Sequence, residues 1–447
     1  SPERKRGVRR NPSLALGASI LVRAETHALC SAFSNPLRHA LHVWLAVAAA
    51  VCIRTVIAPD THTIFPVLAG SATHWWADQP LYAAYPPLDY FRYPPAFAVA
   101  FTPFSALGYR AGGVLWSLLG IGVFVLGLWR FIRDVAPGEW TAARQAVFLA
   151  LGALGALRGL WNAQSNALAV GLLLLAAAAL VRRRWWTAAA VLAASVLIKL
   201  TPLAPALLLC AIKPRRLPAR FLLFLAIGLL APFLTRPPEI VLGHYREWLS
   251  HMAYTGSERW PGFRDGWTVW LVFRDALQGR AGAPAMRAPL VSGVYRAIQL
   301  VTAAAALGWC LWQRRCINDP RKLTTVVLAM GLAWLMLFGP AVEHATYVFL
   351  TPVLNWALLQ RGAWRGGRWL IGTAFVLVMF LGWAVVSPAV METAPILLTV
   401  LPIGTALFTL WLIGYAPIYL RVNQYAQAIS TPCNGNRSQI VLAGKSG

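Results

Sequence analysis

The stretch AQSNALAVGLLLLAAAALVRRR, residues 163–184, begins with two amides, continues as an apolar run and ends in three arginines. Apolar runs of similar length recur from residue 38 to residue 420. The chain of 447 residues is 58% hydrophobic and 12% charged. Because one soluble core cannot bury so much apolar length, the sequence predicts an all-α polytopic membrane protein.

The apolar runs also set the expected organisation of the chain. We expect a basic cytoplasmic segment at 1–37, a membrane domain at 38–420 and a flexible cytoplasmic tail at 421–447. The membrane domain is predicted to hold about 11–13 transmembrane or re-entrant helices. The runs lie near 38–58, 94–107, 112–133, 142–158, 165–181, 185–198, 201–212, 218–235, 291–313, 323–339, 344–360, 369–388 and 395–420.

The basic residues indicate which ends of these helices face the cytoplasm. Lys and Arg number 40 against 15 Asp and Glu, and they fall between apolar runs, which is the pattern of cytoplasmic loops and not of a nucleic-acid-binding face. The predicted cytoplasmic clusters include Arg182–Arg184, Lys213–Arg216, Arg314 with Arg315, and Arg361–Arg368. The loops 59–93 and 236–290 are then expected outside.

Parity imposes one condition on this topology. Arg92 and Gln164 are both expected on the outer side, yet three apolar runs separate them. An even number of crossings is required, so one run, 94–107 or 142–158, is expected to be re-entrant or merged with its neighbour. In the first outer loop, FPVLAGSATHWWA has the spacing of a helix lying at the membrane surface, with Trp75 and Trp76 as headgroup-level anchors.

Several familiar kinds of site are missing from the sequence. The six cysteines have no CxxC spacing, which gives no indication of a zinc site or a disulfide framework. HExxH, Walker, GxGxxG and GxSxG motifs are likewise absent, which removes most soluble-enzyme chemistries. The candidates for chemistry are therefore isolated polar residues near the predicted outer ends of helices.

Two of these candidates lie in the first outer loop. Asp60 follows the first predicted helix, where a partly desolvated carboxylate can accept a proton from a hydroxyl group or can simply end the helix. Arg92, in DYFRYPPAFAVAF (89–101), carries a planar fork that matches phosphate oxygens, but it can also pair with Asp89.

The remaining candidates lie further along the chain. Lys199, between Ile198 and Leu200, requires an anionic partner unless its ammonium reaches the interface. Each of the others could contact substrate or have a structural role. Arg264 and Asp265 could form a loop ion pair, and Glu343 could complement a helix N-terminus. Gln164 and Asn166 could cap a helix.

The order of these segments resembles the family 87 glycosyltransferases. The resemblance rests on the acid Asp60, on Tyr82, which follows it by 22 residues, and on the stretch RYPPAFAVAFTPF. It rests also on the amide pair in AQSNALAVGLLLLA and on LIKLTPLAPALLL, which is followed by a basic cluster. The resemblance covers roughly residues 38 to 360. The sequence departs from the family pattern in two places. Thr61 and His62 follow the acid in place of an aromatic residue, and Ala163 replaces the glycine of Gly-Gln-x-Asn.

The resemblance implies a C-type multi-span fold and a reaction that uses a polyprenyl-phosphate-linked hexose, mannose above all. It implies that Asp60 is the general base, and that Tyr93, Pro94, Pro95 and Lys199 help to form the lipid-phosphate and sugar site. The expected acceptor is a lipid or glycan hydroxyl on the outer face of the cell membrane, in contact with membrane lipids. No metal or other cofactor is expected, because cationic side chains can offset the charge of the leaving phosphate.

Two other functions remain open from the sequence. A transporter or lipid flippase also carries intramembrane charges and broken helices. Against it, no two-fold repeat is evident, and the charges gather toward one face of the membrane instead of its midplane. The second alternative is a non-catalytic scaffold that has kept the fold.

Overall fold

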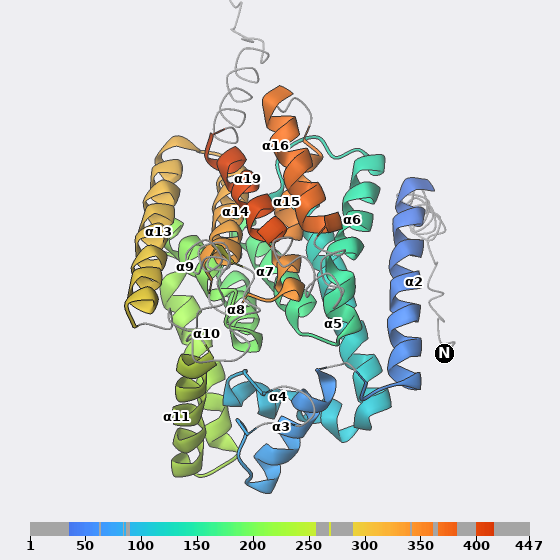
Figure 1. The fold of residues 1–447 in the computed structure, drawn as a ribbon, viewed down its shortest axis with the longest axis vertical. Coiled ribbons are helices and arrows are strands. Elements are labelled where there is room, and N and C mark those ends of the chain that lie inside the picture. Colours follow the sequence, from blue (N-terminus) through green and yellow to red (C-terminus); the bar gives the residue numbers. More distant parts are fainter. Residues whose placement is uncertain are drawn as a thin grey trace, which may run out of the picture.

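A computed structural model describes residues 35–61, 64–83, 85, 90–255, 268–269, 289–339, 342–360, 365–381 and 399–414 (Figure 1). These residues form helices joined by turns, with no extended strand among them, so the all-α prediction is confirmed for this part of the chain. Most of segment 1–37, all of 421–447, and Asp89, Arg264 and Asp265 lie outside the described residues.

Most of the helices coincide with the predicted apolar runs, whereas the helices 65–77 and 238–255 lie in the loops 59–93 and 236–290. In chain order they are α2 (Asn35–Ile57), α3 (Phe65–Ala77), α4 (Pro95–Ala106), α5 (Gly108–Arg130) with η1 (Phe131–Val135), α6 (Ala142–Trp161), α7 (Asn166–Val181), α8 (Trp185–Ile198), α9 (Leu203–Ile212), α10 (Pro218–Leu230) with η2 (Ala231–Leu234), α11 (Pro238–Thr255), α13 (Pro289–Cys316), α14 (Pro320–Phe338), η5 (His344–Phe349), α15 (Thr351–Leu358), α16 (Arg365–Phe375) with η6 (Val376–Leu381), and α19 (Val400–Gly414).

Three described helices are long and apolar enough to cross a bilayer: 36–57, 108–135 and 320–338. Shorter apolar helices include α4, which has 12 residues and is about 18 Å long, well below the roughly 30 Å hydrocarbon core. Helices α3 and α4 pack together at the lower end of the molecule, beneath the long helices (Figure 1). Its short length and its packing against α3 favour 94–107 as the run that does not span, which would satisfy the parity condition.

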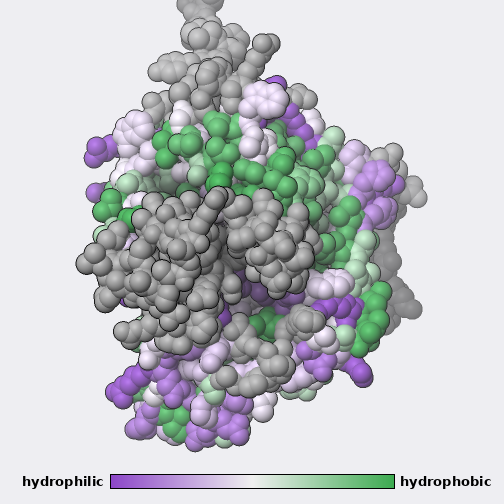
Figure 2. Space-filling view, viewed as in Figure 1, coloured by the Kyte–Doolittle hydropathy of each residue, from purple (hydrophilic) through white to green (hydrophobic). Residues whose placement is uncertain are grey.

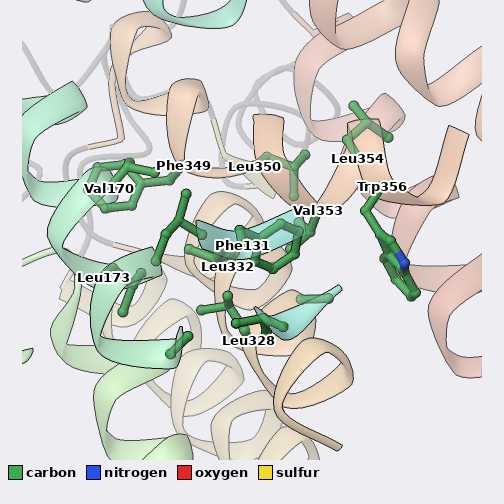
Figure 3. Close-up of a cluster of buried hydrophobic side chains, with 14 of the residues drawn as sticks. Phe131, Val170, Leu173, Leu328, Leu332, Phe349, Leu350, Val353, Leu354 and Trp356 are labelled. Carbon is green, nitrogen blue, oxygen red and sulfur yellow. The ribbon is translucent and has the colours of Figure 1, made fainter. Parts of the chain in front are cut away.

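The long helices pack closely through small residues. A Cβ placed on Gly127 of α5 would lie 2.8 Å from the Cα of Gly171 on α7, so the two backbones touch where only glycine fits. Around this contact a core of buried apolar side chains joins α7, η1, α14, η5 and α15 (Figure 3). It includes Phe131, Leu173 and Phe349.

Three of the predicted cytoplasmic clusters, those near 182, 213 and 314, lie at one end of the bundle. Arg182, after α7, pairs with Asp134 of η1 at 2.6 Å. Arg321 of α14 donates to the carbonyl of Ala136 at 2.9 Å, which brings the start of α14 to the same place. Arg314 of α13 donates to the carbonyl of Ala211 at the end of α9, at 3.5 Å. We call this the basic end.

At the opposite end, α3, α4 and α11 form a more polar layer. Figure 2 shows hydrophilic side chains gathered at the lower end of the molecule and apolar ones above them. The surface helix expected at FPVLAGSATHWWA is α3, but the expected anchoring by both tryptophans is wrong. Trp75 is 1% exposed, because its ring packs against His244 and its Nε1 donates to Thr235. Trp76 is 48% exposed, and its role as an anchor stays a prediction.

Candidate active site

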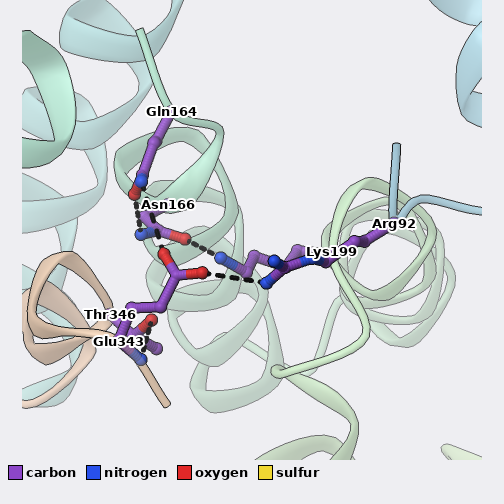
Figure 4. Close-up of polar contacts among 6 residues, drawn as sticks. All are labelled: Arg92, Gln164, Asn166, Lys199, Glu343 and Thr346. Carbon is purple, nitrogen blue, oxygen red and sulfur yellow. Dashed lines mark hydrogen bonds and ion pairs between the residues drawn. The ribbon is translucent and has the colours of Figure 1, made fainter. Parts of the chain in front are cut away.

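Five of the predicted site residues converge at the end of the bundle opposite the basic end. They are Arg92, Gln164, Asn166, Lys199 and Glu343, and Figure 4 shows their side chains pointing toward one another. Their side chains are polar or charged, and they come from four separate segments of the chain. The fold therefore brings together charged residues that are far apart in the sequence.

Hydrogen bonds join these side chains in a continuous series. Arg92 Nη1 donates to Glu343 Oε1 at 3.0 Å, and Gln164 Nε2 donates to Glu343 Oε2 at the longer distance of 3.5 Å. Asn166 Nδ2 donates to Gln164 Oε1 at 2.7 Å. Lys199 Nζ donates to Asn166 Oδ1 at 2.5 Å. Two cations are thus connected through one carboxylate and two amides.

Aromatic packing fixes the segment that carries Arg92. The ring of Tyr93 stacks on Phe97 of α4, with 4.6 Å between the ring centroids. Tyr82 donates its hydroxyl to the Tyr93 carbonyl at 2.8 Å, and Ser165 donates its hydroxyl to the Tyr93 Oη at 3.0 Å. Trp248 of α11 donates Nε1 to the Arg92 carbonyl at 3.4 Å. The arginine therefore projects from a braced backbone.

The amide pair is placed by the turn before α7. Ala163 has φ of 52°, in the left-handed region that favours glycine, which gives a physical reason for the glycine of the family pattern at this position. Trp116 donates to the Ala163 carbonyl at 2.8 Å and holds the turn. Asn166 is fully buried, and its Nδ2 also donates to the Ala345 carbonyl at 3.0 Å.

Glu343 and Lys199 each lie at the end of a helix, next to a non-helical segment: Glu343 directly precedes η5, and Lys199 directly follows α8. Glu343 forms a capping box with Thr346 at the start of η5, which fixes its backbone. Lys199 follows α8, and the turn to Pro202 separates it from α9. Burial lowers the pKa of the Lys199 ammonium, while the carboxylate of Glu343 raises it and Arg92 lowers it. An anion near Lys199 would therefore stabilise its charged form.

The cluster lies at one end of a cavity of about 680 Å³. Arg92, Lys199 and Glu343 are in its wall, together with Tyr93 and Gln164. Beyond them the wall is apolar and is made by α9, α13 and α14, which pack side by side. Leu207 of α9 lines this apolar part of the cavity and is 54% exposed.

The other predicted residues have different outcomes. Asp60 is exposed and lies at the same end of the bundle, since Ile64 N donates to the Asn162 carbonyl at 2.9 Å nearby. It is not among the described residues of the cavity wall, although Ile64 is. Its role as the base stays a prediction. The expected alternative partner of Arg92, Asp89, lies outside the described residues, and within the described residues Arg92 forms an ion pair with Glu343.

Some wall residues were not predicted. Tyr90, Met252 and Trp334 line the cavity, as do the small residues Ala303 and Ala304 of α13. Tyr90 belongs to the quoted stretch 89–101, and its proximity to Arg92 was the only available signal. The alanines resemble any other helix-packing residues. Within the described ranges, no group of three or more His, Cys, Asp or Glu side chains has the arrangement of a metal site.

Comparison with known proteins places the chain in a family. Residues 91–340 match glycosyltransferase family 87, and this range is more than half of the chain. The chain belongs to this family, and with its helical, multi-span architecture it is a membrane glycosyltransferase. No curated protein sequence matches it significantly.

Two solved structures are similar to this chain. One is ArnT from Cupriavidus metallidurans bound to undecaprenyl phosphate, with 19% identity, 87% of this chain and 79% of that chain covered, and a TM-score of 0.34. The other is the same protein in the apo state, with 17% identity, coverage of 85% and 77%, and a TM-score of 0.35.

Proposed function

We propose that this glycosyltransferase moves a hexose, with mannose as the first candidate, from a polyprenyl-phosphate-linked donor to a hydroxyl of a lipid or glycan acceptor. The observation that carries the proposal is the cavity with Arg92 and Lys199 at one end and an apolar wall beyond them. A lipid phosphate has the same two parts, an anionic head and a long apolar chain, and it reaches an enzyme from within the membrane.

Arg92 and Lys199 suit the donor phosphate. Their two positive charges exceed the single negative charge of Glu343, so the cluster has a net charge of about +1 when all three are ionised. The guanidinium fork binds two phosphate oxygens and the ammonium acts as a point charge. As the sugar leaves the phosphate, negative charge grows on the phosphate oxygens, and both cations stabilise it.

The reaction balances with Asp60 as the base. The acceptor hydroxyl gives its proton to the Asp60 carboxylate while its oxygen forms a bond to the anomeric carbon. The bond from that carbon to the phosphate oxygen breaks, and the electron pair leaves with the polyprenyl phosphate. Exposure of Asp60 on the site side of the molecule is compatible with access by a polar acceptor.

We also propose that the site faces the outside of the cell membrane and the basic end faces the cytoplasm. Single cysteines at Thr61 and Arg215, in a chain freed of its other cysteines, test this orientation in intact cells. A membrane-impermeant thiol reagent should label position 61 and should label position 215 only after lysis. The reverse pattern would overturn the orientation without affecting the proposed chemistry.

The reaction itself is tested with purified protein in liposomes. Radiolabelled polyprenyl-phosphate mannose and polyprenyl-phosphate glucose are supplied in parallel, with membrane lipid extract as the acceptor, and labelled products are separated after extraction. Transfer from either donor, lost in Asp60→Asn, supports the proposal, and the preferred donor identifies the sugar. Movement of labelled donor between leaflets without any transfer product would favour a flippase instead.

A further inference from the structure

The inner end of the cavity lies beside cations that the proposed reaction does not use. Ala211 lines the cavity one residue before α9 ends at Ile212. Arg314 Nη1 donates to the Ala211 carbonyl at 3.5 Å. Lys213 follows two residues after Ala211. The apolar wall that begins near Lys199 therefore ends against positive charge at the basic end.

Arg314 continues the cavity wall of α13. Leu307 lines the cavity, and Arg314 is seven residues further along the same helix, which places both on nearly the same helix face. Arg183, in the turn between α7 and α8, is the third cation. Burial first, and then the nearby Arg314 and Arg183, lower the pKa of Lys213. The three like charges come from three segments that lie at the basic end, and like charges there repel one another. We call them the inner cation group.

The inner cation group differs from the other basic residues at this end. Arg130 and Arg182 pair with Asp134, and Arg321 donates to the Ala136 carbonyl. Arg220 lies over the Trp186 ring at 4.8 Å. Across the described part of the chain, no carboxylate forms an ion pair with Arg183, Lys213 or Arg314. The general excess of cytoplasmic charge does not explain why these three converge without an anion.

The surface around the group is apolar and exposed. Leu207 is 54% exposed on α9, and Leu311 and Trp312 are 38% and 51% exposed on α13. Helices α9 and α13 lie side by side (Figure 1). A tryptophan and leucines next to cations, at a helix end, are typical of the headgroup region of a bilayer. Any molecule that binds here therefore meets positive charge on one side and an apolar surface on the other.

We propose that the inner cation group binds the phosphate of an anionic phospholipid from the cytoplasmic leaflet, whose acyl chains lie along α9 and α13. Charge complementarity selects this occupant: a net negative lipid offsets the repulsion within the group, whereas a zwitterionic lipid brings its own cation. The site lies at the opposite end of the cavity from Arg92 and Glu343, so it does not depend on the proposed transfer reaction.

The test measures lipid binding to the purified full-length protein in detergent. Phosphatidylglycerol and phosphatidylcholine with identical acyl chains are titrated, and bound lipids are counted by native mass spectrometry. The variant is Lys213→Gln with Arg314→Gln. The matched control is Arg215→Gln with Arg315→Gln, which removes the same charge from exposed positions of the same two segments.

We expect the wild-type protein to prefer phosphatidylglycerol. At about fivefold in affinity for each cation, the double variant should lose roughly 25-fold, while the control should stay within about twofold. Equal loss in the control, or an unchanged preference in the double variant, would overturn the proposal. Competition by inorganic phosphate as strong as by the lipid would also overturn it, because the site would then bind soluble anions.

A second measurement does not depend on the variants folding. Phosphatidylglycerol with a photoactivatable acyl chain is bound to the wild-type protein and crosslinked, and the labelled peptides are mapped. Labelling concentrated in 203–217 and 307–316 supports the site. Labelling of other segments to the same extent contradicts it.

Discussion

Replacing Glu343 by glutamine should tighten the binding of the lipid product. The cluster of Arg92, Lys199 and Glu343 has a net charge of about +1. The proposed donor is a phosphodiester with one negative charge, but the released polyprenyl phosphate is a monoester with about −1.5 to −2 charges at pH 7. The site therefore matches the donor and is short of positive charge for the product. Glu343→Gln removes this mismatch.

The size of the effect follows from the geometry. Glu343 Oε1 lies 3.0 Å from Arg92 Nη1, and a phosphate oxygen bound by the second N–H of the same nitrogen would also be about 3 Å from it, which puts carboxylate and phosphate at most about 6 Å apart. At an effective dielectric constant of about 20, each unit of phosphate charge is repelled by about 2.8 kcal/mol. The Glu343 side chain is 40% exposed, and halving the value for solvent screening leaves about 1.4 kcal/mol, or tenfold.

The assay is competitive binding of polyprenyl phosphate and of a non-hydrolysable phosphodiester analogue to the purified protein. Glu343→Gln should bind the diester about 10-fold more tightly and the monoester roughly 30- to 100-fold more tightly, and its turnover should fall because the product leaves slowly. Glu239→Gln, the same change on α11, serves as the control. Weaker or unchanged monoester binding in Glu343→Gln would refute the role of Glu343 as the opposing charge.

Three further outcomes are expected. Asp60→Asn should slow transfer about 10²- to 10⁴-fold with donor affinity retained, as measured by single-turnover kinetics; full activity would mean that another acid is the base. Lys199→Ala should weaken donor binding by about 1.5 to 3 kcal/mol in the same titration, and an unchanged affinity would remove Lys199 from the phosphate site. Gly171→Val should destabilise the protein by about 1 to 3 kcal/mol, because its Cβ would meet the Val123 carbonyl at 2.6 Å, whereas Gly122→Ala on α5 meets nothing within 4 Å; equal melting temperatures in detergent would contradict the close packing of α5 and α7.

The positions of the helices were predictable because their signal is local. A run of apolar residues near bilayer length, ended by arginines, specifies a membrane helix without reference to the rest of the chain. The run 94–107 was ambiguous, since its composition is that of a span although it is short, and its packing with α3 could not be read from the sequence. Trp75 was misjudged for a related reason: a tryptophan at the interface and a buried one look the same in sequence.

The residues of the site could be predicted from the sequence, but which of them bind one another could not. Lys199 and Glu343 stand out because charge next to apolar runs needs a partner. One partner of Arg92, Glu343, lies 251 residues away, and no local pattern in the sequence predicts that pair. The apolar wall of the cavity gave no signal at all, because the alanines and leucines that line it also serve in cores and on lipid-facing surfaces.

The two short helices on either side of Lys199 make membrane thickness matter to this enzyme. Helix α8 has 14 residues and α9 has 10, so they extend about 21 Å and 15 Å from the basic end, against roughly 30 Å of hydrocarbon. Lys199, at the end of α8, then lies well below the opposite surface. A lipid headgroup reaches that depth only where the bilayer thins or the headgroup is drawn inward, and each ångström of mismatch costs a fraction of a kcal/mol. The host membrane, through its acyl-chain length, thereby becomes a variable of substrate delivery, and a thinner bilayer brings its headgroups closer to the site.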